Sequence, residues 1–428
     1  MCHLRGVHDN GKRQYRYEAS IEYRSTRLYS KQSSQAEREG RSIFGHHGVS
    51  PLHTILDNPL PRSIIIDYMH ATLLGHGKRM ILTIYDQVKP SQRSMIDFQL
   101  KNQPCPHFFN RRMRAISDFA HVKATEIRNT LFYGLLPVLQ EHLSIQQLSH
   151  LALYVCATRL YHCESFHGDD VCNVAEKLFR LYYRDHEDYY TGLQNFVLHL
   201  HSHYPIIHRN YGALCHIGCF GQEDLIGHVS SNHSGTRYHG ESICHHYNID
   251  FFLQHRVEVQ QKDGPVDPSG EVPDQTTYAY ACHRRVCDCD QINRCIVIYR
   301  RCVIRERVYH SLIYKRSPKS ISYFVEYYSD ETIHQPTYGT IQCFFTCNNE
   351  SFALIQRHAM KQLYSDRFRS STYYRSLKRS LDSLFVVLDN APTRSDVITV
   401  KNISRHCIVF DKKNELIVTA ISAYDEHD

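Results

Sequence analysis

The feature that most constrains this chain is a change of residue pattern across a cluster of breaking residues. Residues 260–275 contain three prolines and two glycines, which interrupt both helices and strands. Apolar residues recur at helical spacing before this cluster and gather in short β-branched runs after it. We therefore predict two parts, residues 1–255 and 291–428, joined by a linker over residues 256–290.

The first part is predicted to be helical from about Thr125 to Tyr190, because its apolar residues follow a helical period. Ser144 followed by Gln147 predicts a capping box at one helix start. Asp170 predicts the start of another helix. A helix is also expected around the later run His199-Leu200-His201-Ser202-His203, where it would point the histidines in different directions and argue against a metal site.

A short apolar stretch precedes this helical region. Residues 63–67, Ser-Ile-Ile-Ile-Asp, are dense in β-branched side chains, which predicts a buried strand that ends at an acid. A helix is expected to follow from Met69 to Tyr85, interrupted at Gly75 and Gly77.

The second part has the pattern of an all-β region. Seven short runs of strand-forming residues follow one another at a spacing typical of a small barrel or sandwich. The runs cover residues 295–299, 308–314, 323–328, 339–346, 384–388, 403–410 and 416–421.

Composition narrows the class of protein further. With 428 residues, of which 42% are hydrophobic and 22% charged, the chain can bury a globular core. It has no apolar run of about 18 residues, so no transmembrane helix is expected. Sixteen cysteines without a secretory signal indicate reduced thiols. The net charge of +6 permits binding to nucleic acid but does not require it.

Several blocks of the first part occur in the order found in one family of enzymes. They are Ile66-Asp67-Tyr68-Met69-His70, Ala124-Thr125-Glu126-Ile127-Arg128 and Cys219-Phe220-Gly221-Gln222-Glu223-Asp224-Leu225. Together they resemble the CACTA (En/Spm-like) DNA transposases over about residues 1–250. The resemblance implies an α/β fold, an incomplete ribonuclease-H-like core with a helical insertion at about 115–205, followed by a small β-rich C-terminal domain.

The resemblance also implies a chemistry. Transposases of this DDE type use three carboxylates to hold two divalent metals, which activate the attacking oxygen and stabilise the leaving oxygen of a phosphodiester. Mg²⁺ or Mn²⁺ would be the ancestral cofactor, because such hard cations prefer oxygen ligands. Glu223 matches the last carboxylate and would be a metal ligand. Asp67 and His70 match a conserved element of the same site.

The family's first two catalytic aspartates are not found in this chain. Cys2 resembles the second half of a cysteine pair that follows those aspartates in the family. We therefore expect an N-terminally truncated copy that binds DNA but does not cleave it. A competing hypothesis is an active nuclease whose metal ligands are not recognised from the sequence.

Plainer interpretations exist for each candidate residue. Asp67 could cap the following helix, Glu223 could be a solvated acid at a helix start, and His70 could be a hydrogen-bonded surface histidine. The cysteines between Cys282 and Cys295 offer soft ligands for zinc, but their spacing matches no ordinary zinc finger.

Basic side chains in the second part bear on partners. They neutralise phosphates, so a cluster of them predicts contact with DNA, although a solvated strand edge has the same composition. The cluster suggests an alternative function, a domesticated nuclear DNA-binding or adaptor protein that acts through the β domain. Either function places the chain in the nucleus, with DNA as partner. The candidate nucleic-acid-binding residues are Arg300, Arg301, Arg305, Arg307, Lys315 and Arg316.

Overall fold

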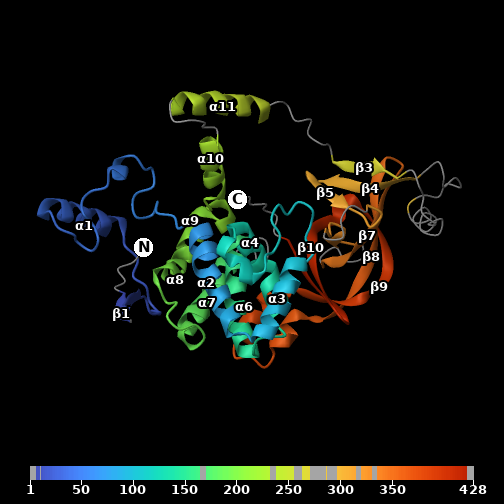
Figure 1. Cartoon of the computed structure of the whole chain (residues 1–428), viewed down its shortest axis with the longest axis horizontal. Coiled ribbons are helices and arrows are strands. Elements are labelled where there is room, and N and C mark those ends of the chain that lie inside the picture. Colours follow the sequence, from blue (N-terminus) through green and yellow to red (C-terminus); the bar gives the residue numbers. More distant parts are fainter. Residues whose placement is uncertain are drawn as a thin grey trace.

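The computed structural model combines a helical body with a β-rich part (Figure 1). Helices occupy the middle of the view, and the sheet lies beside them. Helices α10 (Phe220–Ser231) and α11 (His239–Gln254) stand away from the body. None of the described helices is long and apolar enough to cross a bilayer. The structure describes residues 6–9, 11–163, 170–231, 238–254, 263–269, 286, 296–314, 320–329 and 335–421.

The N-terminal segment forms a hairpin, β1 (Val7–Asp9) and β2 (Lys12–Gln14), followed by helix α1 (Thr26–Glu39). The Ser25 hydroxyl accepts a hydrogen bond from the backbone N–H of Leu28 at 3.2 Å, which caps the start of α1. Among the described residues before Gln254, this hairpin is the only sheet. The larger sheet that a ribonuclease-H-like core requires is therefore not among the described residues of this half.

The prediction of a strand at residues 63–67 is wrong. These residues form a turn and an extended segment, and Asp67 begins the π-helical turn η2 (Met69–Gly77). The backbone N–H groups of Met69 and His70 donate to the Asp67 carboxylate at 3.2 Å and 2.9 Å. Local capping by this carboxylate therefore outweighs the β preference of the three isoleucines, since strand propensity depends strongly on context.

The predicted helix after Met69 is continuous, because η2 runs directly into α2 (Lys78–Gln87). The two glycines do not interrupt it. A Cβ at Gly75 would lie 2.6 Å from the carbonyl oxygen of His70 and 2.8 Å from Cγ1 of Val197. Glycine at this position therefore allows the widened turn and the close approach of the segment around Val197.

The predicted helical region is confirmed, together with its caps. Ser144 and Gln147 form the capping box of α6, and Asp170 is the N-cap residue of α7. Every residue of α6 from Leu148 to His162 is buried, so this helix lies at the centre of the body. The helices are α3 (Pro90–Asn102), η3 (Ile116–His121), α4 (Ala124–Asn129), η4 (Thr130–Gly134), α5 (Leu135–Leu139), α6 (Ile145–His162), α7 (Val171–Arg184), η7 (His186–Asp188), α8 (Phe196–Leu200), η8 (His201–His203), α9 (Tyr204–Tyr211), η9 (Leu214–His216), α10 (Phe220–Ser231) and α11 (His239–Gln254).

The β-rich part is antiparallel throughout its paired strands and closes on itself. The order is β3-β4-β7-β6-β10-β11-β9-β8, and an additional pairing of β7 with β8 completes a ring of strands. Each strand predicted after residue 290 has an observed counterpart, whereas β3, β8 and helix α14 (Tyr374–Leu384) were not predicted. The strands are β3 (Gly264–Pro268), β4 (Val297–Ile304), β5 (Arg307–His310), β6 (Phe324–Tyr327), β7 (Thr337–Cys347), β8 (Glu350–Leu363), β9 (Val386–Thr399), β10 (Ile403–Lys412) and β11 (Glu415–Ala420).

The two parts share one buried hydrophobic cluster, and the described residues of the β-rich part form three further clusters of their own. Side chains of α14, β10 and β11, including Leu381, Phe410 and Ile417, belong to the same buried cluster as α6 and α7. Strand β3 lies within the segment predicted as a linker and pairs with β4. The change of secondary structure along the chain therefore does not coincide with a break in the largest cluster, which includes side chains from both parts.

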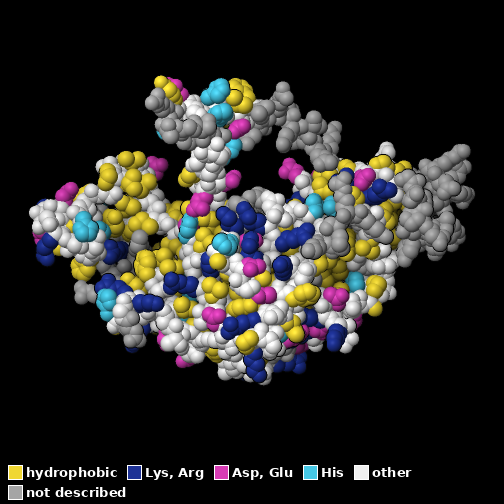
Figure 2. Space-filling view, in the orientation of Figure 1, with side chains coloured by type: hydrophobic (Ala, Val, Ile, Leu, Met, Phe, Trp, Pro, Cys, Tyr) yellow, Lys and Arg dark blue, Asp and Glu magenta, His cyan; other side chains and the backbone are white. Residues whose placement is uncertain are grey.

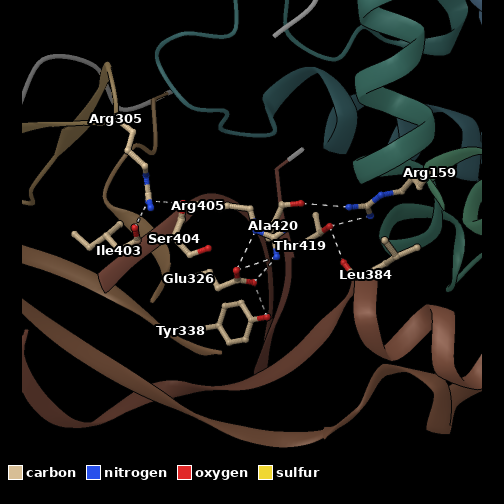
Figure 3. Close-up of polar contacts among 10 residues, drawn as sticks. All are labelled: Arg159, Arg305, Glu326, Tyr338, Leu384, Ile403, Ser404, Arg405, Thr419 and Ala420. Carbon is tan, nitrogen blue, oxygen red and sulfur yellow. Dashed lines mark hydrogen bonds and ion pairs between the residues drawn. The ribbon is translucent and has the colours of Figure 1, made fainter. Parts of the chain in front are cut away.

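A buried arginine joins the two parts (Figure 3). Arg159 of α6 donates to the Phe132 carbonyl at 2.9 Å, to the Thr419 hydroxyl at 3.0 Å and to the Ala420 carbonyl at 3.2 Å. Burial lowers the pKa of Arg159 to about 10, because the charged form loses its hydration. Its guanidinium also lies over the Phe385 ring, 5.2 Å from the centroid, so this cation is held by carbonyls and an aromatic face.

Candidate functional site

Asp67, His70 and Glu223 form a continuous row of polar contacts. Asp67 Oδ2 lies 2.5 Å from His70 Nδ1, and His70 Nε2 lies 3.1 Å from Glu223 Oε1. The structure thus brings together the three candidate catalytic residues, which come from two distant sequence blocks. We call this row the acid–histidine–acid site.

Backbone groups hold the Asp67 end of the site. Besides the two N–H groups of η2, the N–H of Cys219 donates to Asp67 Oδ1 at 2.9 Å. One carboxylate therefore ties the start of η2 to the segment that leads into α10. A Cβ at Gly218 would lie 2.8 Å from Cε1 of Tyr68, so glycine permits this close approach.

The Glu223 end of the site is more open. Glu223 lies in the first turn of α10, where its backbone N–H donates to the Cys219 carbonyl at 2.9 Å. A negative charge is favoured there by the helix dipole. The Glu223 and His70 side chains are 52% and 55% exposed, whereas that of Asp67 is 18% exposed. The imidazole can therefore be reached from solvent.

The plainer interpretations of these residues are also visible in the structure. Asp67 does cap a helical turn, and Glu223 is an acid in the first turn of a helix. The two contacts place the imidazole between the carboxylates, with one acid at each ring nitrogen. A ring in this position is suited to pass a proton between the two acids.

The donor set does not fit a two-metal centre. That chemistry needs three oxygen-donating carboxylates around two hard cations. Here an imidazole lies between two carboxylates and contacts both. No group of three or more His, Cys, Asp or Glu residues suited to a metal occurs in the part of the chain that the structure describes. The role of Glu223 as a metal ligand, with Mg²⁺ or Mn²⁺, is therefore not supported by its surroundings.

Cys219 lies beside the acid–histidine–acid site but is not activated. Burial raises the pKa of its thiol, and the charge of Asp67, a hydrogen bond to Asp67 and the charge of Glu223 add to the effect. A reactive cysteine requires the opposite shift, because the thiolate is the nucleophile. Nucleophilic catalysis by Cys219 is therefore disfavoured.

Three of the candidate nucleic-acid-binding residues, Arg301, Arg305 and Arg307, make contacts within the fold. Arg305 donates to the carbonyls of Ile403 and Ser404, the latter at 3.1 Å (Figure 3). Arg301 Nε lies 3.4 Å from Asp267 Oδ2.

Arg307 lies over the Phe108 ring, 5.9 Å from its centroid, and Arg300 is half-buried on β4. Lys315 and Arg316, like the cysteine cluster between 282 and 295, lie outside the described residues. Part of the predicted basic cluster therefore serves the fold itself.

Sequence reasoning missed a second group of titratable residues at the centre of the helical body. His76, His150, His186 and His201 are at most 1% exposed. The His76 ring contacts the rings of His186 and His201, and the His186 ring also contacts that of His150. We call these four residues the histidine cluster. No local pattern marks it, because its members come from η2, α6, η7 and η8.

Burial favours the neutral form throughout the histidine cluster, and two of its members make hydrogen bonds to Tyr182. His76 Nε2 lies 2.7 Å from the Tyr182 hydroxyl, and His150 Nε2 lies 3.0 Å from the Tyr182 carbonyl. Burial lowers the pKa of His150 and His201 to about 4 and that of His186 to about 3. The expected helix at His199–His203 is observed as α8 and η8, with His201 turned into this cluster.

Comparisons with known proteins add no family assignment. No protein-family model matches the chain, and neither the curated proteins nor the solved structures include a match. The resemblance to CACTA transposases therefore stays a prediction from the sequence blocks.

Proposed function

We propose that this chain is a transposase-derived DNA-binding protein, similar to the CACTA transposases, that does not cleave DNA strands. The observation that carries the proposal is the contact among Asp67, His70 and Glu223. The resemblance assigns these residues to one site although they belong to distant blocks. A pocket inherited from an ancestral enzyme accounts for their meeting.

The absence of strand cleavage follows from the donor set. Two carboxylates separated by an imidazole give fewer oxygen ligands than a pair of hard cations needs. His70 is held at both nitrogens, so each carboxylate already has a partner. The acid–histidine–acid site then connects η2 to α10 structurally. It keeps the residues of the ancestral site but not the ability to cleave DNA.

DNA binding is supported by charge. Lys and Arg side chains gather near the middle of the face in Figure 2, between the base of α10 and the β-rich part. The whole chain carries a net charge of +6. Basic side chains at such a surface displace counterions from DNA, so affinity should fall steeply with salt. A nuclear location would follow from this partner.

The second candidate function is a nuclear DNA-binding or adaptor protein that acts through the β-rich part. The closed ring of β7, β6, β10, β11, β9 and β8 favours it, because such a ring is a rigid support for a binding surface on the adjoining strands β3, β4 and β5. Under this alternative, Arg300 and Arg301 on β4 carry most of the DNA contact.

A pair of measurements tests these functions. We expect no Mg²⁺-dependent nicking of supercoiled DNA by the unaltered protein; nicking that disappears in Glu223→Ala would overturn the proposed loss of cleavage. We expect duplex DNA affinity to fall between about 50 and 200 mM salt. Affinity that does not change with salt would contradict DNA binding. A smaller salt slope in the variant with Arg300→Ala and Arg301→Ala would favour the second function.

A further inference from the structure

The loop after α3 crosses from the helical body onto the barrel and leaves a pocket where it does so. Cys105 of this loop forms an isolated parallel bridge with Ser320, and the Ile321 N–H donates to the Cys105 carbonyl at 3.2 Å. The Gln103 side chain donates to the Val409 carbonyl at 2.9 Å. The pocket has a volume of about 340 Å³. We call it the seam pocket, and its main lining residues are His107, Arg112, Arg301, His310, Tyr314 and Tyr323.

The seam pocket carries positive charge from both parts of the molecule. Arg112 comes from the crossing loop, and Arg301 comes from β4. Arg301 Nε is buried without a hydrogen-bond partner in the described structure, and its contact to Asp267 at 3.4 Å is an ion pair only. Asp267 is thus an acid that lies next to the Arg301 guanidinium. A bound anion would supply the hydrogen bonds that Arg301 lacks.

Aromatic rings form the walls between these charges. The rings of His107 and His310 are stacked with centroids 4.2 Å apart, and the Tyr314 ring lies 4.4 Å from His310. The Arg301 guanidinium lies over the Tyr314 ring at 4.9 Å from its centroid. Flat aromatic and guanidinium surfaces of this kind accept the face of a nucleic-acid base.

His107 is held in place before any ligand arrives. Its backbone N–H donates to the hydroxyl oxygen of Ser322 at 2.9 Å, and its Nδ1 lies 2.8 Å from the same oxygen. Burial, with a smaller contribution from the charge of Arg301, lowers the pKa of His107. A neutral His107 that accepts the Ser322 proton at Nδ1 keeps its own proton on Nε2, as one further donor for an anion.

We propose that the seam pocket binds a nucleotide, with its phosphate against Arg112 and Arg301 and its base against the His310 and Tyr314 rings. The pocket volume falls within the roughly 300–1,000 Å³ typical of small-ligand sites. The ligand is either a free nucleotide or a nucleotide at the end of a DNA strand, which share this chemistry. The inference goes beyond the proposed function, because it uses no residue of the acid–histidine–acid site.

Calorimetric titration with adenosine 5′-monophosphate, adenosine and inorganic phosphate tests the proposal. We expect the monophosphate to bind more tightly than either component alone. Phosphate alone contacts only the two arginines, and adenosine alone contacts only the aromatic rings. Arg112→Gln should weaken binding of the monophosphate about tenfold, because one charge-assisted contact is lost. Arg41→Gln, a substitution of an exposed arginine paired with Glu39, is the matched control and should leave binding unchanged.

The outcomes separate the proposal from its alternatives. Equal affinity for adenosine and its monophosphate, or equal binding by Arg112→Gln and the unaltered protein at unchanged melting temperature, would overturn it. Tyr314→Leu should reduce affinity for the monophosphate but not for phosphate.

A single-stranded oligonucleotide with a 5′-phosphate distinguishes the two sources. Tighter binding of the oligonucleotide that is lost in Arg112→Gln identifies a strand end, and affinity equal to that of the monophosphate identifies a free nucleotide. Monophosphate binding that persists when duplex DNA binding fails would separate this site from the proposed function.

Discussion

Acidification should destabilise this protein well before its carboxylates titrate, because the histidine cluster is buried in the neutral form. Burial lowers the pKa of His150 and His201 to about 4 and that of His186 to about 3. Burial, and then the charges of the other three histidines, holds the pKa of His76 well below its ordinary value. In the unfolded chain these side chains titrate near pH 6.5.

The magnitude follows from the difference in proton uptake. Between about pH 6.5 and 4 the unfolded chain binds a proton at each histidine, whereas the folded chain does not. Stability is therefore complete above pH 6.5 and is lost as the pH falls toward the folded values. From pH 7.5 to 5.5 each histidine lowers the free energy of unfolding by about 1.3 kcal/mol, and His150, His186 and His201 together lower it by about 4 kcal/mol. That is a large share of the ~5–15 kcal/mol typical of a folded domain.

Urea denaturation at pH 7.5, 6.5 and 5.5, followed by circular dichroism, measures this loss. His186→Phe is the decisive variant, because neither ring nitrogen of His186 has a hydrogen-bond partner among the described residues. Between pH 7.5 and 5.5, the free energy of unfolding should fall by about 1.3 kcal/mol less in the variant than in the unaltered protein. His47→Gln, at an exposed position, is the control and should keep the full pH dependence. Equal stability at pH 7.5 and 5.5, or an unchanged pH dependence in His186→Phe, would refute the reasoning.

Four further substitutions test the packing around the site and between the two parts. Arg159→Met should lower the free energy of unfolding by about 3 kcal/mol, because buried acceptors on β11 lose their donor; a urea midpoint equal to that of the unaltered protein would contradict this. Asp67→Ala should lower the free energy of unfolding by about 2 kcal/mol in the same assay, since three backbone N–H groups lose their acceptor. Glu223→Gln, at an exposed side chain, should lower it by less than about 0.5 kcal/mol. A larger loss in Glu223→Gln than in Asp67→Ala would show that the contact to His70 dominates. Gly75→Ala should cost about 1–3 kcal/mol by crowding the His70 carbonyl, and thermal denaturation would reveal a milder effect if the turn relaxes.

Much of the fold could be predicted from local patterns, and the errors have local causes. The capping box at Ser144 and the runs that became β4, β6, β7, β10 and β11 depend on neighbouring residues, so their signals are strong. Helix α14 was missed although its buried residues Leu377, Leu381 and Leu384 follow a helical period. The strand at 63–67 failed because one carboxylate redirected the backbone.

The candidate site could be predicted only through the resemblance. Periodicity places Asp67 and Glu223 on separate elements, and nothing in their spacing indicates that His70 would contact both. The seam pocket and the histidine cluster were beyond prediction for the same reason. Their residues come from segments far apart in the chain, and their neighbourhood depends on packing that no local pattern encodes.

The shared core has a consequence for how the protein is made. Ile421, the last residue the structure describes, belongs to the same buried cluster as α6. A ribosome must therefore release the chain as far as about residue 421 before the central helix can be fully enclosed. During synthesis the apolar faces of the helical segments are exposed to water, and chaperones would bind them. Fragments ending near residue 255 should consequently aggregate or be degraded in cells.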